Sequence, residues 1–179
     1  MRPIRRLRIG LSAACIAMAV SQAAAGDLGR ITAFLDGDPI VWHTITMQQG
    51  GRTVATASVT QGARLTEVYV QGHPEPAFGT AKLFTLEARY VGPYAAGVLP
   101  LSVDIMYMPD GMGGPFWTSR GATRAPSLDI VALDVWGNFG RLEAVFEGEL
   151  CLRRIISSAT DPATCRTVSG LIETEIFAE

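Results

Sequence analysis

Two cysteines near the C-terminus are the residues whose spacing says most about chemistry. Cys151 and Cys165 stand in the stretch ELCLRRIISSATDPATCR, with thirteen residues between them. Paired cysteines form metal sites, redox-active dithiols or structural disulfides. A zinc site needs further ligands at regular spacing, and His43 and His73 do not provide that spacing. A redox-active pair is typically C-x-x-C, so the sequence predicts a structural disulfide between Cys151 and Cys165.

The N-terminus predicts a compartment in which such a disulfide persists. MRPIRRLR places four arginines before the apolar run IGLSAACIAMAV, which leads into the small residues SQAAAG. This order is typical of a bacterial secretory signal peptide. We therefore expect a cleavable signal helix over residues 1–25 and an exported chain, residues 26–179, in the periplasm or outside the cell. The alternative is a lipoprotein signal with acylation at Cys15. The apolar run is shorter than the ~20 residues of a spanning helix, so stable membrane insertion is not expected.

Histidine and methionine residues form a second candidate site. Met106, Met108 and Met112 fall within seven residues, and His43 and Met47 share one face of a predicted strand. Thioether and imidazole groups are suitable ligands for copper, so copper handling is an alternative function. Methionine also fills gaps in apolar cores, and the sequence has no alternating Met-His repeat. We therefore predict no metal and no cofactor.

The residues needed for nucleophilic catalysis do not form a recognisable pattern. No serine stands in a G-x-S-x-G turn, and the two histidines of residues 26–179 fall in different contexts. His43 lies within the predicted strand IVWHTITM, and His73 lies in the loop GHPEP. A histidine in a strand is more often structural than catalytic, and one in a proline-rich loop is more often solvated. The sequence therefore favours a non-catalytic protein, with a periplasmic enzyme as an alternative.

The longest irregular segment is the candidate binding loop. Residues 108–126, MPDGMGGPFWTSRGATRAP, include two aromatic residues and two arginines. Long loops in compact β domains often bind ligands or partners. The candidate ligand-binding or partner-binding residues are Phe116, Trp117, Arg120 and Arg124. The alternative is an ordered loop whose aromatic side chains cap one end of the core.

Period-two patterns and frequent turn signals predict the elements that would position these residues. Residues 26–179 are expected to form one all-β domain, an antiparallel β-sandwich or closed barrel of about 8–10 strands. The predicted strands are 29–35, 40–47, 52–60, 65–71, 81–91, 99–108, 116–118, 128–136, 141–152 and 166–177. Strand 128–136 is apolar on both sides, which predicts a central strand with both faces covered.

The last two strands predict their own register. Even positions are mainly apolar and odd positions mainly charged in 141–152, and 166–177 has the same apolar parity. A hairpin that pairs Cys151 with Cys165 also pairs Phe146 with Gly170, a large residue with a small one. A slip of one residue would turn one apolar set to water. Both cysteines occupy odd positions, so they are expected on the solvent side.

Charge and composition narrow the function classes. Removing residues 1–25 leaves 11 basic and 17 acidic residues, a net charge of 11 − 17 = −6. Nucleic-acid binding is therefore not expected, because it depends on neutralising phosphates. The sequence predicts an exported, non-catalytic binding or structural module with an unknown protein or small-molecule partner.

The ending FEGELC…C…VSGLIETEIF resembles the closing hairpin of small secreted β-sandwich and calycin-like proteins, without identifying any site residue. That resemblance implies the alternative of a carrier for a small hydrophobic ligand.

Overall fold

The structure, a computed structural model, describes residues 26–179, so the predicted signal helix and cleavage site lie outside the described residues. The described chain is all β apart from the short 3-10 turn η1 (Gly111–Gly113). None of its helices combines the length and apolarity needed to span a membrane. The strands are β1 (Gly26–Leu35), β2 (Asp38–Gln49), β3 (Arg52–Ala55), β4 (Ala57–Gln61), β5 (Leu65–Gly72), β6 (Leu83–Val91), β7 (Ser102–Met108), β8 (Phe116–Thr118), β9 (Ser127–Trp136), β10 (Phe139–Arg153) and β11 (Asp161–Ala178).

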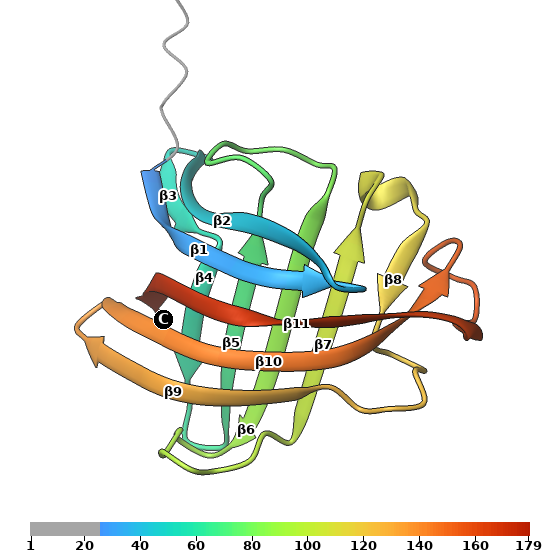
Figure 1. Ribbon diagram of the computed structural model, residues 1–179. Coiled ribbons are helices and arrows are strands. Elements are labelled where there is room, and N and C mark those ends of the chain that lie inside the picture. The colour runs from blue at the N-terminus through green and yellow to red at the C-terminus, as the bar shows by residue number, and fades with distance from the viewer. Residues whose placement is uncertain (1–25) are drawn as a thin grey trace, which may run out of the picture.

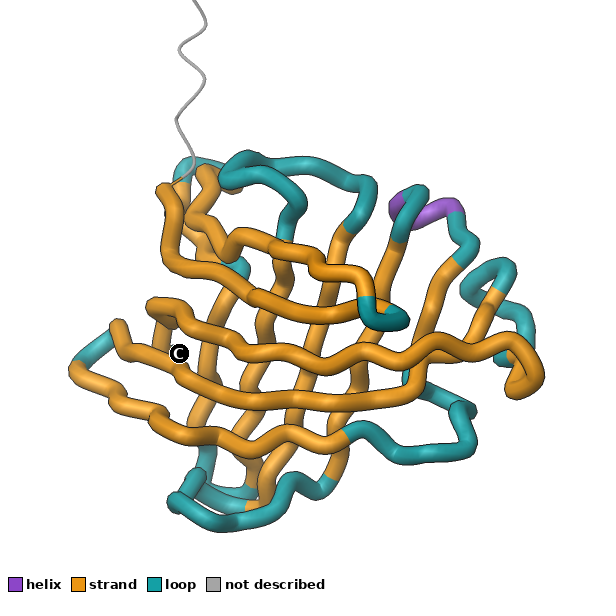
Figure 2. Tube along the Cα trace, viewed as in Figure 1, coloured by secondary structure: helices purple, strands orange, loops and turns teal. Residues whose placement is uncertain are grey.

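The strands lie in two layers that cross one another. In the front layer β2, β1, β11, β10 and β9 run side by side, and in the back layer β4 to β8 run across them (Figures 1 and 2). The full order is β3-β2-β1-β11-β4-β5-β6-β7-β8-β10-β9. Such crossing follows when twisted strands pass from one packed layer to the other at corners. The apolar side of each layer faces the other layer.

Strand β11 turns the sheet into a ring. It pairs with β1 and β10 in the front layer and also pairs in parallel with β4 in the back layer. The parallel joint consists of Phe177 with Ser58 and Ala178 with Val59. The sheet is therefore mixed rather than purely antiparallel. The ring is not a barrel, because its strands form two crossed layers with short joints, and the barrel alternative is wrong.

One predicted strand is divided by a corner. Residues 52–60 fall in β3 and β4, which are separated at Thr56, so residues 26–179 contain eleven strands rather than the ten predicted. The backbone N–H of Ile45 donates to Thr56 Oγ1 at 2.7 Å, and the N–H of Thr56 donates to the Ile45 carbonyl at 2.8 Å. These bonds satisfy the backbone where the chain passes from β3, beside β2, to β4 in the back layer.

The predicted register of the C-terminal hairpin is confirmed. β10 and β11 pair Cys151 with Cys165 and Phe146 with Gly170. The apolar parity explains this register, because the even residues Leu142, Phe146 and Ile172 are buried between the layers. Gly170 is required by the packing, since a Cβ there would lie 2.6 Å from the Thr32 carbonyl oxygen.

The predicted place of residues 128–136 is wrong. These residues belong to β9, which is the last strand of the sheet and, within the described part of the chain, pairs with β10 alone. Val131 and Trp136 are more than half exposed, at 59% and 58%. An apolar pattern on both sides usually marks a strand covered on both faces, but here the outward side and the edge remain open.

Aromatic side chains fill the space between the layers. Trp42 from the front layer is fully buried and stacks on Phe84 from the back layer, with ring centroids 4.7 Å apart. Its indole N–H donates to the Lys82 carbonyl at 2.8 Å, which satisfies the one polar atom of the ring. Phe84 also contacts Phe146 of β10. The core therefore joins the two layers through large rings.

Candidate functional site

The disulfide joins two paired residues of β10 and β11, just before the register shift that leads to the pair of Leu152 with Asp161. Cys151 Sγ and Cys165 Sγ are 2.05 Å apart. Cys151 is completely buried, so the expectation that both sulfurs face solvent is wrong for this residue. The reason is strand β8, whose Thr118 pairs with Cys151 on the side opposite β11. Glu149 lies beside the two sulfurs, but sulfurs joined in a disulfide are not thiolate ligands for a metal ion.

The aromatic residues of the predicted binding loop contact the protein interior. Phe116 is 1% exposed and packs in a small cluster with Leu83 and Met108. Trp117 is half-buried, and the guanidinium carbon of Arg166 lies 4.3 Å from the centre of its ring. Both aromatic residues belong to β8, where three-residue pairing with β10 fixes their directions. Their arrangement corresponds to the alternative in which the aromatic residues cap the core.

The two arginines of this loop contact different layers. Arg120 forms a bidentate ion pair with Asp104 of β7, with both N–O distances 2.9 Å. This pair lies by a hollow that Met106 and Tyr69 also line. Arg124 instead reaches β10 and β11 of the front layer. The structure therefore does not bring Arg120 and Arg124 into one site.

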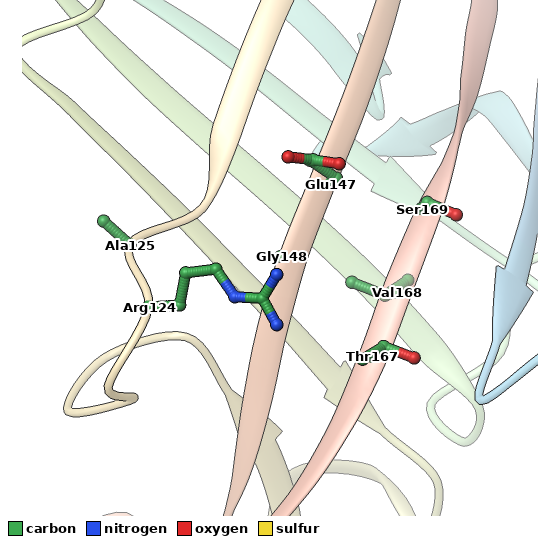
Figure 3. A pocket seen from close by; sticks show the side chains of 7 residues that line it. All are labelled: Arg124, Ala125, Glu147, Gly148, Thr167, Val168 and Ser169. Atoms are coloured by element: carbon green, nitrogen blue, oxygen red, sulfur yellow. The ribbon is translucent and has the colours of Figure 1, made fainter.

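Arg124 lines an open polar hollow of about 200 Å³ on the front layer. Its side chain extends across β10 at Gly148, toward Thr167 on the neighbouring strand (Figure 3). The backbone of Arg124 is held by Glu149, whose Oε1 accepts the Arg124 N–H at 3.4 Å. The remaining lining residues are Ala125, Glu147, Val168 and Ser169. A guanidinium beside hydroxyl groups and a carboxylate can form hydrogen bonds with a small polar group.

The candidate copper ligands fall into separate surroundings. His43 lines a polar hollow with Asp27, Arg30 and Glu173, and its Nδ1 lies 3.9 Å from Asp27 Oδ1. Met47 pairs with Val54 of β3. The other three methionines lie elsewhere: Met108 is buried with Phe116, Met106 packs against that pair, and Met112 is exposed on η1. The hollow lined by His43 includes no methionine, and Met106 lines a different hollow.

The backbones of His43 and His73 lie side by side. Their N–H and carbonyl groups exchange hydrogen bonds of 2.7 and 2.8 Å, which connect β2 to the end of β5. His73 is fully buried, and its Nδ1 accepts the N–H of Gly79 at 3.4 Å. Burial lowers the pKa of His73, although the Gly79 hydrogen bond opposes the shift. His73 therefore has a structural place at this corner.

The outward side of β2, β1, β11, β10 and β9, here called the outer face, holds a surface that was not predicted. Cross-strand pairs place Val41, Thr32, Leu171 and Val145 in one row across four strands. Val41 and Val145 are 45% and 48% exposed, and Phe34 in the next row is 52% exposed. The sequence does contain one sign of this surface. Val145 and Leu171 are apolar residues at odd positions of the last two strands, where the other residues are mostly polar or charged.

An aromatic group lies at one end of the outer face. Phe139 pairs with Trp136 of β9 and with Phe177 of β11. The Phe139 and Phe177 rings meet edge to face, with centroids 5.1 Å apart. Phe139 and Trp136 remain more than half exposed. Aromatic groups exposed together with aliphatic rows are typical of surfaces that bind other proteins.

Comparisons of the chain with protein-family models, with curated proteins and with solved structures found no match.

Proposed function

We propose that the chain is an exported, non-catalytic binding module that recognises a partner protein through its outer face. The observation that carries this proposal is the row of Val41, Thr32, Leu171 and Val145, in which Val41 and Val145 are exposed and Leu171 is half-buried. The exposed Phe34 lies in the next row. Covering exposed apolar side chains stabilises a complex by about 25 cal/mol per Å² of apolar surface removed from water. Exposed apolar groups on one face are typical of protein-binding surfaces, which supports the proposal.

The filled interior favours this function over a carrier for a hydrophobic ligand. Three aromatic side chains occupy the space between the layers: Trp42 contacts Phe84, and Phe84 contacts Phe146. The hollows lined by Arg124, by His43 and by Arg120 are open, and each includes charged side chains. Carrier sites are concave and mostly apolar. The apolar surface that remains for a partner therefore lies outside the core.

The disulfide supports the exported part of the proposal. Cys151 and Cys165 are joined, and structural disulfides persist mainly in oxidising compartments such as the periplasm or the extracellular space. The crossed layers place this disulfide at one end of β10 and β11, the two strands at the centre of the outer face. We propose that it holds this part of a two-layer sandwich in place for binding.

Site-specific photo-cross-linking in the exporting cell tests this function. A photoreactive amino acid at Val41 or Val145 should form a specific cross-linked product, and one at Thr60 should not. Thr60 is the control, because it is exposed and lies on β4 of the back layer. Val145→Glu should abolish the product formed at Val41, whereas Thr60→Glu should leave it unchanged. Equal products from Val145 and Thr60, or none from either outer-face position, would overturn the proposal.

A further inference from the structure

Strand β9 presents an open edge on the outer face. It is ten residues long, and among residues 26–179 it pairs with β10 alone. Figure 1 shows it as the outermost strand of the front layer, with β10 on one side only. An unpaired edge exposes a row of backbone N–H and carbonyl groups that can pair with another strand. Natural edge strands are usually short or protected, whereas β9 is long; its register against β10 shifts between Ala132 and Ile130.

Hairpin geometry identifies the backbone groups that face outward. β9 and β10 are joined by Gly137 and Asn138, and Trp136 pairs with Phe139 across this two-residue turn. Residues that flank such a turn exchange both of their hydrogen bonds. Alternate residues then face away from β10, so Leu133 and Val135 direct their N–H and carbonyl groups to the open edge.

Apolar side chains accompany this edge on both sides of the strand. Val131 and Trp136 are exposed, and Val135, on the side facing the back layer, is 38% exposed. A strand added at this edge would cover apolar surface on both of its faces.

The charge around the edge selects the chemistry of that strand. Where β9, β10 and β11 lie side by side, the outward ionisable residues are Asp129, Asp134, Glu143, Glu147, Glu173, Glu175 and Arg141. This surface is strongly acidic, in agreement with the net charge of −6 for residues 26–179. Opposite charges across neighbouring strands stabilise pairing and like charges oppose it. The complementary strand is therefore cationic.

The same charges disfavour a second copy of this chain. If two β9 strands paired antiparallel about the peptide bond between Val131 and Ala132, each Asp129 would lie opposite an Asp134. Other registers would still bring two acidic outer faces together. A strand that alternates lysine or arginine with β-branched residues meets no such repulsion. The cations would lie beside Asp129 and Asp134, and the apolar residues would cover the side that faces the back layer.

We propose that β9 accepts an extended, cationic segment of a partner protein as an added strand of the front layer. This inference rests on the proposed function, because it specifies how the partner meets the outer face. Backbone hydrogen bonds at Leu133 and Val135 supply affinity, and the carboxylates select the partner's charged residues. Binding extends the front layer by one strand and covers the aliphatic residues along its edge.

A synthetic peptide tests the inference directly. The probe is a ten-residue peptide that alternates lysine with valine, added to the oxidised protein and measured by fluorescence anisotropy at low salt. A peptide of the same composition in scrambled order and one with glutamate in place of lysine serve as controls. We expect binding of the alternating lysine peptide only. Asp129→Asn and Asp134→Asn should each weaken binding by up to about fivefold, the range for exposed charge pairs.

Backbone pairing is tested separately from charge. Val135→Pro removes an outward N–H group and should weaken binding at least about tenfold, whereas Val135→Thr keeps this group and nearly the same shape and should not. Circular dichroism checks that both variants fold. Should Val135→Pro fail to fold, N-methylation of alternate peptide amides provides the same test with the unaltered protein.

Two results would overturn the inference: equal binding of the alternating and scrambled peptides, or equal affinity of Val135→Pro and Val135→Thr. Absence of peptide binding at millimolar concentration would also overturn it. Each of these results leaves the proposed function intact if Val41 and Val145 still form specific cross-links. The inference and the proposed function can therefore fail separately.

Discussion

Replacement of the disulfide by alanine at Cys151 and Cys165 should lower the stability of the exported protein substantially. The two residues are separated by 14 positions, so the disulfide closes a loop of about 15 residues. In the chain-entropy treatment, removing the disulfide gives the unfolded chain more conformational freedom. This lowers the free energy of unfolding by roughly 3 kcal/mol. For a chain of this size, 1 kcal/mol corresponds to about 2–4 °C in Tm. We therefore expect Tm to fall by roughly 6–12 °C in the double variant.

Strand content should survive this change. The β10–β11 pairing extends without interruption from Phe139 with Phe177 to Cys151 with Cys165, and the buried even residues hold its register. Thermal circular dichroism of three samples tests the prediction: oxidised protein, reduced protein and the double variant. The reduced protein keeps the buried sulfur of Cys151, so its difference from the double variant isolates the packing loss. Identical melting of the oxidised and reduced proteins would refute the role assigned to loop closure.

Three further predictions concern packing, ionisation and a surface ion pair. Gly170→Ala should destabilise the protein by at least about 1–3 kcal/mol in urea unfolding, because its Cβ would lie 2.6 Å from a backbone oxygen. Gly79→Ala, with open space at its Cβ, is the control and should change stability much less. Burial, with smaller contributions from Tyr94 and Asp129, raises the pKa of Tyr90 to about 12. Its raised pKa stabilises the fold fully below pH ~10, and this stabilisation should be lost as pH rises from about 10 to 12; ultraviolet titration of Tyr90→Phe beside the wild type checks this. Arg120→Gln should cost no more than about 1 kcal/mol, because the ion pair with Asp104 is solvent-exposed; a larger loss would contradict the exposed geometry.

The parts of the structure that sequence predicted correctly are those in which one periodic pattern decides the outcome. β10 and β11 each have one apolar parity, and the two cysteines act as a second marker of register. Any alternative pairing would expose Phe146 or Ile172 or separate the sulfurs. Most predicted strands also correspond to observed strands, because turn residues separate them. The strand predicted to begin at Leu99 instead begins at Ser102, which leaves Leu99 in an exposed loop.

The features that sequence could not predict depend on which strand lies beside which. Cys151 has the parity of a solvent-facing residue, but it is buried because β8 pairs with the end of β10. Phe116 belongs to an irregular segment, yet β8 directs it into a small apolar cluster. Neither outcome is contained in the local pattern, because both result from the ring of strand pairings. The predicted binding residues therefore do not form one site: Phe116 lies in a buried cluster, Arg120 contacts the back layer and Arg124 contacts the front layer.

The error for β9 leads to the functional interpretation. In the sequence pattern Val131, Leu133 and Val135 share one side of this strand, and the other side is also apolar except at Asp134, which is typical of a central strand with both faces covered. In the structure it has one neighbour, and its outward residues meet water. An edge strand of ten residues is a hazard for uncontrolled pairing unless charges restrict what can pair with it. Asp129 and Asp134 provide this restriction, because they repel a second copy of the chain and attract a cationic strand. The apolar composition and the acidic flank of β9 are therefore both explained if a partner strand completes the front layer.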